Sequence, residues 1–237
     1  MFSAFKMLFV YGIFGGAVGI LGVPYSFLIR DIGPLYRLAM RIMHAGVVAG
    51  GIRVEIVGKE NLLAGRSCIF MSNHVSNLDP PVLMPSLPGR SSILLKKSLM
   101  GIPVLGTAMR MAKFVPVERG SNVEAAKASI AAAASALREG LNIIVFPEGT
   151  RSVDGRLKVF KKGPFFLAED TKAPIVPIAI SGTQNMMRKG SFSIRPGVAR
   201  VEFLKAIEPS EYASREELMA AVRGAIDAAL PVEMKAV

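Results

Sequence analysis

The N-terminal part of the chain contains its longest uncharged apolar stretch. Residues 7–29 carry no charged side chain and are flanked by Lys6 and Arg30. A bilayer core requires about 20 apolar residues in a helix, so the stretch is long enough for one crossing. Pro24 can divide the helix, in which case the segment dips into one leaflet. A buried helix of a soluble core is the competing interpretation.

A second helix is expected over residues 34–50, where an apolar face lies beside arginines. Its apolar positions include Leu35 and Ile42, and Arg37 and Arg41 are interleaved with them. This combination is typical of a helix at a membrane interface. We therefore expect residues 1–50 to anchor the chain to a membrane. The positive charge after the first segment predicts that the globular part faces the cytoplasm.

From residue 52 onward, short β-branched runs alternate with helical stretches. Helices are expected over 122–139, with Ser121 as its cap and Gly140 at its end, and over about 215–230. The runs that predict strands are residues 52–57, 67–71, 91–95, 114–117, 142–146, 175–180 and 199–204. The alternation indicates an α/β fold, a mixed sheet flanked by helices, formed by residues 51–237 as one domain.

Composition narrows the class of partner. Of 237 residues 51% are hydrophobic and only 20% are charged, yet the net charge is +11. Such a charge favours polyanionic partners. Tryptophan is absent and there are four tyrosines, which leaves little for stacking on nucleic-acid bases. We therefore expect anionic lipids and phosphorylated substrates as partners, and no nucleic acid. The single cysteine, Cys68, lies in an apolar run and is expected to be a buried small residue.

The first chemical motif is Asn73-His74-Val75-Ser76-Asn77-Leu78-Asp79, which follows an apolar strand. A histidine with a carboxylate five residues further on can form a hydrogen-bonded pair. The carboxylate then orients the imidazole, whose free nitrogen removes a proton from a hydroxyl. Two structural interpretations compete: Asp79 before Pro80 can cap a helix, and His74 can be an ordinary loop histidine. A metal site is not expected, because one His and one Asp supply too few ligands.

Two further motifs follow predicted strands. Phe146-Pro147-Glu148-Gly149-Thr150-Arg151-Ser152 places a carboxylate, a flexible glycine, a hydroxyl and an arginine in one turn, and Val117-Glu118-Arg119 ends another strand in an arginine. Ligands of open α/β sheets gather at the carboxyl ends of strands. Glu148 can bind substrate hydroxyls there, and both arginines suit phosphate oxygens. Each motif alone is equally compatible with a solvated polar turn.

Together these pieces resemble the glycerolipid acyltransferase family, over about residues 50–205. The blocks that carry the resemblance are Asn73-His74 with Asp79 (N-H-x4-D), Val117-Glu118-Arg119, residues 146–152 (F-P-E-G-T-R-S, matched in full) and Val176-Pro177-Ile178-Ala179-Ile180. Four blocks in the family's order are much more specific than any one of them. Ahead of the second block this chain has Ala112-Lys113 where family members often have glycine.

The resemblance implies a role for each block. His74 is the general base and Asp79 orients it, with Asn73 beside them. Arg119 binds the acceptor's phosphate. Glu148, Gly149, Thr150 and Arg151, with Pro147, shape the acceptor site, and Pro177 supports the pocket.

The implied reaction transfers a fatty acyl chain from acyl-CoA or acyl-carrier protein to the sn-2 hydroxyl of lysophosphatidic acid, without a cofactor. The expected location is the bacterial cytoplasmic membrane. Another lysolipid acceptor, such as a lyso-ornithine lipid, is one alternative. A lipid hydrolase is another, although no G-x-S-x-G nucleophile motif is present.

Overall fold

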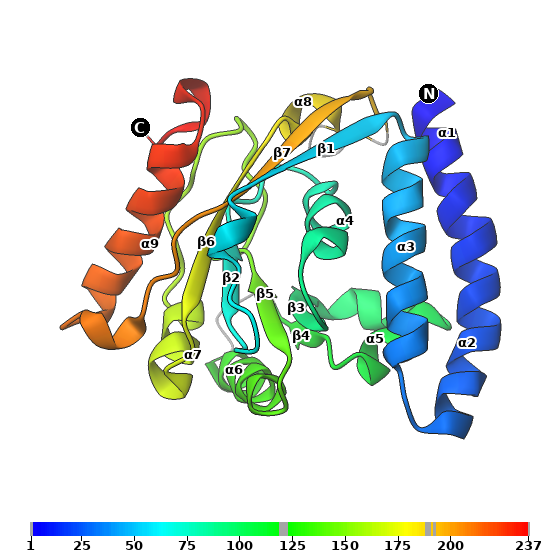
Figure 1. The fold of residues 1–237 in the computed structure, drawn as a ribbon, viewed down its shortest axis with the longest axis horizontal. Helices are drawn as coiled ribbons and strands as arrows, with labels where there is room; N and C mark the ends of the chain where they lie inside the picture. Colours follow the sequence, from blue (N-terminus) through cyan, green and yellow to red (C-terminus); the bar gives the residue numbers. More distant parts are fainter. Residues whose placement is uncertain (1, 119–122, 188–190, 192, 237) are drawn as a thin grey trace.

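The centre of the molecule is a seven-stranded mixed sheet (Figure 1). The computed structural model describes residues 2–118, 123–187, 191 and 193–236. The strands are β1 Ile52–Val57, β2 Ile69–Ser72, β3 Ser91–Lys96, β4 Val115–Val117, β5 Asn142–Val145, β6 Ile175–Ser181 and β7 Gly197–Phe203. Their order across the sheet is β1-β7-β6-β2-β5-β3-β4, and only the β6–β7 pairing is antiparallel. The expected mixed α/β sheet is confirmed.

Alternating side chains of the central strands build two cores, one on each face of the sheet. In β2, Ile69 and Met71 belong to one buried cluster and Phe70 to the other. The period of two follows from the pleat of a strand. Because both faces are covered, the central strands are apolar at almost every position, as is typical of parallel sheets.

Three helices cover one face of the sheet: α6 Val123–Arg138, α7 Gly163–Thr171 and α9 Arg215–Ala229. The cap of α9 is as expected, since the Ser214 hydroxyl accepts the Glu217 N–H. Ser121, the expected cap of α6, lies outside the described residues. The shorter elements are α4 Asp79–Leu83, α5 Leu105–Met111, α8 Thr183–Met186, η2 Lys59–Asn61, η3 Met84–Ser86, η4 Lys97–Gly101, η5 Pro209–Glu211 and η6 Val232–Met234.

The other face is covered by α4 and by an N-terminal helical pair (Figure 1). The first helix runs without a break through α1 Phe2–Phe9, a π-helical turn η1 Val10–Gly15, and α2 Gly16–Ile29. Pro24 lies inside α2 and does not end the helix; the irregularity is the π-turn instead. This is the one described helix long and apolar enough to cross a membrane, judged by length and composition.

The second helix, α3 Gly33–Ala49, lies between the first helix and the sheet (Figure 1). Val47 is fully buried in the core beneath it. The Tyr36 hydroxyl accepts the Ser91 N–H at 3.0 Å, at the start of β3. These contacts tie α3 directly to the sheet, so part of the expected membrane anchor also belongs to the core of the globular domain.

The first helix turns an apolar face away from the rest of the protein. Phe5, Phe9, Leu21 and Leu28 are among the large apolar side chains that stay exposed along it, with Leu28 at 81%. Isolated apolar side chains are common on protein surfaces, but a contiguous stripe along a whole helix marks an interaction surface. The stripe supports contact of this helix with lipid.

Candidate active site

The carboxyl ends of three neighbouring strands bring the candidate residues together. β2 leads into the loop with His74, β5 into Pro147 and Glu148, and β6 into Gly182 and Thr183. These strands lie side by side in parallel, so their ends meet at one edge of the sheet. Two of the sequence motifs, distant along the chain, are therefore adjacent in space. β4, which precedes Arg119, is parallel to β3 and ends at the same edge.

His74 and Asp79 form the expected pair. His74 Nδ1 lies 2.8 Å from Asp79 Oδ2, and the Asp79 side chain is fully buried while that of His74 is 15% exposed. An ionised carboxylate at this distance accepts the Nδ1–H, which leaves the lone pair on Nε2. Among the described residues Nε2 has no hydrogen-bond partner. The imidazole also stacks on Phe146, with ring centroids 4.1 Å apart, which holds it in one plane.

Asp79 is held by more donors than the histidine alone. Its Oδ2 also accepts the backbone N–H groups of Val75 and Ser76, each at 2.8 Å. Its Oδ1 accepts the hydroxyl of Thr183 at 2.6 Å, and both of those side chains are fully buried. Four donors therefore satisfy the oxygens of this buried carboxylate. The capping interpretation is wrong: Asp79 is the first residue within α4, whose N-cap is Leu78 and has no side-chain cap hydrogen bond, and the Asp79 oxygens accept from residues outside that helix.

Sequence reasoning did not identify Thr183. It lies on α8, 104 residues beyond Asp79 along the chain. The available signal was Gly182-Thr183 directly after a predicted strand whose neighbour carries the histidine. Gly182 has φ +91°, and a Cβ there would lie 2.2 Å from the carbonyl oxygen of Val198. That close approach requires glycine and aims Thr183 back beneath the loop.

Two clamps fix the backbone of the histidine loop. The Asn73 side chain donates to the carbonyl of Ile180 at 2.9 Å and accepts the Ile180 N–H at 2.8 Å. On the other side, the Ser152 N–H donates to the carbonyl of His74 at 2.8 Å. The loop is therefore attached both to β6 and to the 146–152 turn. Such clamps preorganise a catalytic group.

Glu148 lies beneath the histidine loop rather than at the surface. Only 3% of the residue is exposed, and its Oε1 accepts the backbone N–H of His74 at 2.8 Å. Its Oε2 has no hydrogen-bond partner among the described residues. Burial raises the pKa of this carboxyl to about 7, against the lowering effects of the His74 hydrogen bond and the Lys158 charge. The geometry supports a positioning role for Glu148, in place of direct contact with substrate hydroxyls.

The raised pKa of Glu148 predicts a specific dependence of stability on pH. The folded protein keeps this proton up to about pH 7, whereas the unfolded chain loses it near the ordinary value of 4.5. Between these values the folded state binds more protons, so the free energy of unfolding falls as pH rises, by about 3 kcal/mol in all. We expect Glu148→Gln to remove this decrease. Denaturant unfolding at about pH 5 and about pH 8 measures it.

The matched control is Glu233→Gln, which changes an exposed glutamate. We expect it to leave the pH dependence of the unfolding free energy as in the wild-type protein. An unchanged slope in the Glu148→Gln variant would show that this carboxyl is ionised in the folded state.

The rest of the 146–152 turn brings positive charge to the site. Gly149 has φ +72°, and a Cβ there would lie 2.7 Å from Cε of Lys161. The Lys158 ammonium donates to the Thr150 hydroxyl at 2.9 Å. Arg151 is half-buried. A turn that gathers three cations within its reach suits an anionic acceptor.

The structure places two of the remaining expected site residues, Pro147 and Pro177. Pro147 is buried at the start of the turn, and Pro177 lies within β6, opposite Met71 of β2, below the edge where His74 lies. Arg119 lies outside the described residues. Lys113, at the place where family members often have glycine, adopts φ +60°. Among the described residues, no group of three or more His, Cys, Asp or Glu side chains is placed to hold a metal ion.

Comparisons with known proteins identify the family. Residues 53–181 match the family model described as Acyltransferase. The chain is 34% identical to the 1-acyl-sn-glycerol-3-phosphate acyltransferase of Limnanthes alba, over 90% of this chain and 74% of that protein. It is 30% identical to the human 1-acyl-sn-glycerol-3-phosphate acyltransferase alpha, over 87% and 72% of the two chains.

A solved structure matches the fold as well. The crystal structure of the 1-acyl-sn-glycerophosphate (LPA) acyltransferase PlsC from Thermotoga maritima superposes with a TM-score of 0.78 at 28% sequence identity, and covers 94% of this chain and 90% of that one. The chain therefore belongs to the acyltransferase family, and the resemblance found in its sequence is confirmed. It is an acyltransferase whose relatives are named for 1-acyl-sn-glycerol-3-phosphate.

Proposed function

We propose that this enzyme transfers a fatty acyl chain from a thioester, acyl-CoA or acyl-carrier protein, to the sn-2 hydroxyl of 1-acyl-glycerol 3-phosphate, forming phosphatidic acid. The observation that carries the proposal is the imidazole of His74, oriented by buried Asp79 through a 2.8 Å hydrogen bond and free of partners at Nε2 among the described residues. The acceptor is inferred from the names of the relatives.

The proposed mechanism is direct attack. Nε2 of His74 removes the proton of the acceptor hydroxyl as its oxygen attacks the thioester carbonyl carbon. The resulting imidazolium is stabilised by the Asp79 carboxylate. Collapse of the tetrahedral intermediate breaks the carbon–sulfur bond, and the proton passes from His74 to the departing thiolate. No acyl-enzyme forms, because a thioester is already reactive enough for an activated alcohol.

The phosphate of the acceptor is proposed to lie among cations at the same edge of the sheet. Arg119 remains the proposed phosphate ligand by resemblance. Arg151 and Thr150, in the 146–152 turn, are proposed as further substrate-binding residues. Lys158 and Lys161 lie against this turn. Arginine and lysine bind phosphate strongly through charge-assisted hydrogen bonds.

A hydrolase reaction is less compatible with the loop. The nearby hydroxyl, that of Ser76, is fully buried, donates to the Met187 carbonyl at 2.9 Å and accepts the Leu78 N–H. A hydroxyl engaged on both sides and closed to solvent is poorly placed to act as a nucleophile.

The proposed function is tested by an acyl-transfer assay on the purified full-length protein. We expect 1-acyl-glycerol 3-phosphate to be acylated far faster than lyso-ornithine lipid, lysophosphatidylcholine or water. Each acceptor is offered with both acyl-CoA and an acyl-carrier protein thioester. Preferred acylation of an acceptor without a phosphate monoester, or release of free fatty acid as the main product, would contradict the proposal.

We also propose that residues 1–50 attach the enzyme to the cytoplasmic face of a membrane, with residues 51–237 as the catalytic domain. The uncovered apolar stripe of the first helix supports this proposal. We expect Phe9→Glu/Leu21→Glu to lower partitioning onto phosphatidylcholine vesicles by at least about 100-fold, because a charge in the apolar layer costs about 2–3 kcal/mol. Both side chains are more than half exposed, so the fold should survive.

Vesicle flotation with the full-length protein makes this measurement. The control is Val232→Glu, which introduces a glutamate at a site 82% exposed beyond α9; α9 lies on the side of the molecule away from α2 (Figure 1). We expect the control to float like the wild-type protein. Undiminished flotation of the Phe9→Glu/Leu21→Glu protein would exclude the stripe as the membrane contact.

A further inference from the structure

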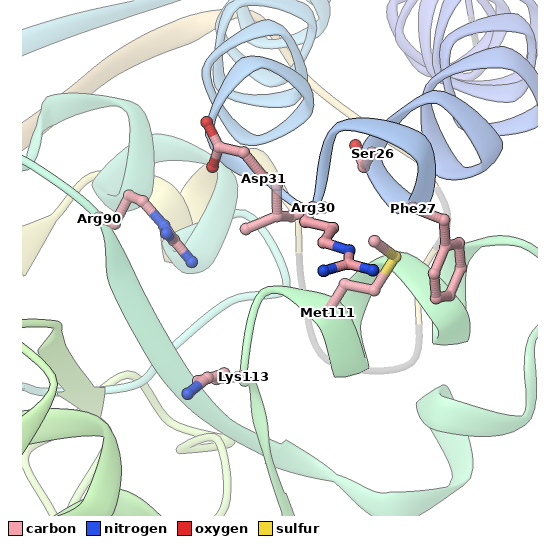
Figure 2. A pocket seen from close by; sticks show the side chains of 8 residues that line it. Ser26, Phe27, Arg30, Asp31, Arg90, Met111 and Lys113 are labelled. Atoms are coloured by element: carbon pink, nitrogen blue, oxygen red, sulfur yellow. The ribbon is translucent and has the colours of Figure 1, made fainter.

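An open pocket of about 350 Å³ lies where the end of α2 meets the start of β3 (Figure 2). Arg30, Arg90 and Lys113 bring positive charge to its lining, and Ser26, Phe27 and Met111 complete much of the wall. In Figure 2 the two guanidinium groups and the ammonium group surround the same opening. None of these residues belongs to the four motif blocks.

The pocket is distinct from the candidate active site. Arg90 directly precedes β3, and Ser91 is paired with Asn142 at the start of β5. His74 follows the opposite, carboxyl end of β2, which is parallel to β5. Strands of four to six residues at about 3.3 Å per residue separate the two edges by roughly 13–20 Å. A group bound in the pocket is therefore not the one that reacts at His74.

The charge of the pocket is positive after its carboxylates are counted. Asp31 lies in the lining and accepts the Gly33 N–H at 2.7 Å, and Glu139 pairs with Lys113. Three cations thus face two carboxylates. Neither Arg30 nor Arg90 has an ion pair among the described residues. The carbonyl end of α2 disfavours an anion, and Arg30, located at that end, offsets its partial negative charge.

Two donors of the lining lack acceptors. The Ser26 hydroxyl, in a residue 1% exposed, and Nε of Arg90 are buried without a hydrogen-bond partner among the described residues. Buried donors without acceptors are rare in folded proteins and call for an explanation. A phosphate offers only acceptor atoms to these groups at neutral pH, and a guanidinium binds it through several N–H groups.

The surroundings favour a lipid as the source of the phosphate. Phe27, 61% exposed, lies at the rim of the pocket and continues the apolar stripe of the first helix. A lipid headgroup bound by the arginines would place its acyl chains against that stripe. We propose that this pocket binds the phosphate of an anionic phospholipid that is not the substrate, and so gives the enzyme a second, charge-dependent contact with the membrane.

The proposal is tested with the full-length protein and two kinds of vesicle, phosphatidylcholine alone and phosphatidylcholine mixed with phosphatidylglycerol. We expect Arg30→Gln/Arg90→Gln to lower partitioning onto the mixed vesicles by about thirtyfold, and to leave partitioning onto phosphatidylcholine unchanged. The matched control is Lys172→Gln/Lys205→Gln, which removes the same charge from two exposed lysines elsewhere. Equal losses of partitioning in both double variants would show that only the overall charge matters, and would overturn the proposal that the pocket binds lipid.

Ser26→Ala provides a second variant that does not depend on charge. Its hydroxyl has no partner to lose among the described residues, so the protein without lipid should unfold at the wild-type temperature or above. We expect partitioning onto the mixed vesicles to fall about fivefold, which corresponds to the loss of one hydrogen bond. Wild-type partitioning of this variant, together with wild-type partitioning of the arginine variant, would overturn the proposal.

A third arm separates the lipid from free phosphate. Short-chain phosphatidylglycerol and inorganic phosphate are each added to the protein in neutral detergent, and the temperature of unfolding is measured. We expect stabilisation by the lipid alone, and none in the Arg30→Gln/Arg90→Gln variant. Stabilisation by inorganic phosphate to the same extent would overturn the proposal that the bound phosphate belongs to a lipid. The pocket would then be a site for the free anion.

Discussion

His74→Ala is expected to lower kcat by about 10²–10⁴-fold, because the change removes the general base from the acceptor hydroxyl. The imidazole is 15% exposed and its ring contributes one stacking contact with Phe146. The backbone of the loop stays attached through Asn73 and Ser152. The fold should therefore persist while turnover is lost. Steady-state acyl transfer, together with thermal unfolding of the same preparation, measures both.

The matched control for this change lies in the same loop. Asn77 is exposed and lies outside the histidine–aspartate pair. We expect Asn77→Ala to keep wild-type turnover. A His74→Ala enzyme that retains the wild-type rate would show that another group removes the proton, and the proposed mechanism would then be wrong.

Asp79→Asn is expected to lower kcat by about 10⁴-fold, the loss seen when the aspartate of a serine-protease triad is changed in the same way. Asp79 Oδ2 receives three N–H donors, from His74, Val75 and Ser76. An amide cannot accept on both sides, so either its NH2 group faces those donors or Thr183 loses its acceptor. The loop should shift and the wrong imidazole tautomer should form. We also expect the unfolding free energy to fall by about 2–4 kcal/mol.

Thr183→Val separates the loss of orientation from the loss of fold. It keeps the carboxylate and the three N–H donors, and removes only the hydroxyl that donates to Oδ1 at 2.6 Å. We expect kcat to fall about tenfold with KM little changed, and Thr183→Ser to restore most of the rate. A Thr183→Val enzyme with wild-type kcat would remove this hydroxyl from the set of positioning groups.

Strand positions were predictable because their signal is local. Runs of β-branched and aliphatic residues between turn signals were expected over seven segments, and each overlaps a strand. β1 was predicted to the residue. The others differ by one or two positions at their ends, where a strand stops as soon as its neighbour no longer provides partners. The helix end at Gly140 was equally local, since φ +84° at that position favours glycine.

Interpretation of Glu148 and Pro24 required the tertiary structure. A glutamate in a polar turn suggests contact with substrate, but the structure buries Glu148 beneath the histidine loop, where its Oε1 accepts the His74 N–H. Proline in a helix suggests a break. In this protein the first helix continues past Pro24 and packs along α3, and tertiary contacts commonly outweigh local propensity.

The sequence by itself determined the α/β class, the apolar N-terminal helix and the pairing of His74 with Asp79, because each depends on residues close together along the chain. Only the tertiary structure decided that Thr183 joins this pair from 104 residues away, that α3 belongs to the core, and that Arg30 and Arg90 face one pocket. Those features depend on how the sheet orders its strands, and contacts between distant segments leave no periodic pattern in a single sequence.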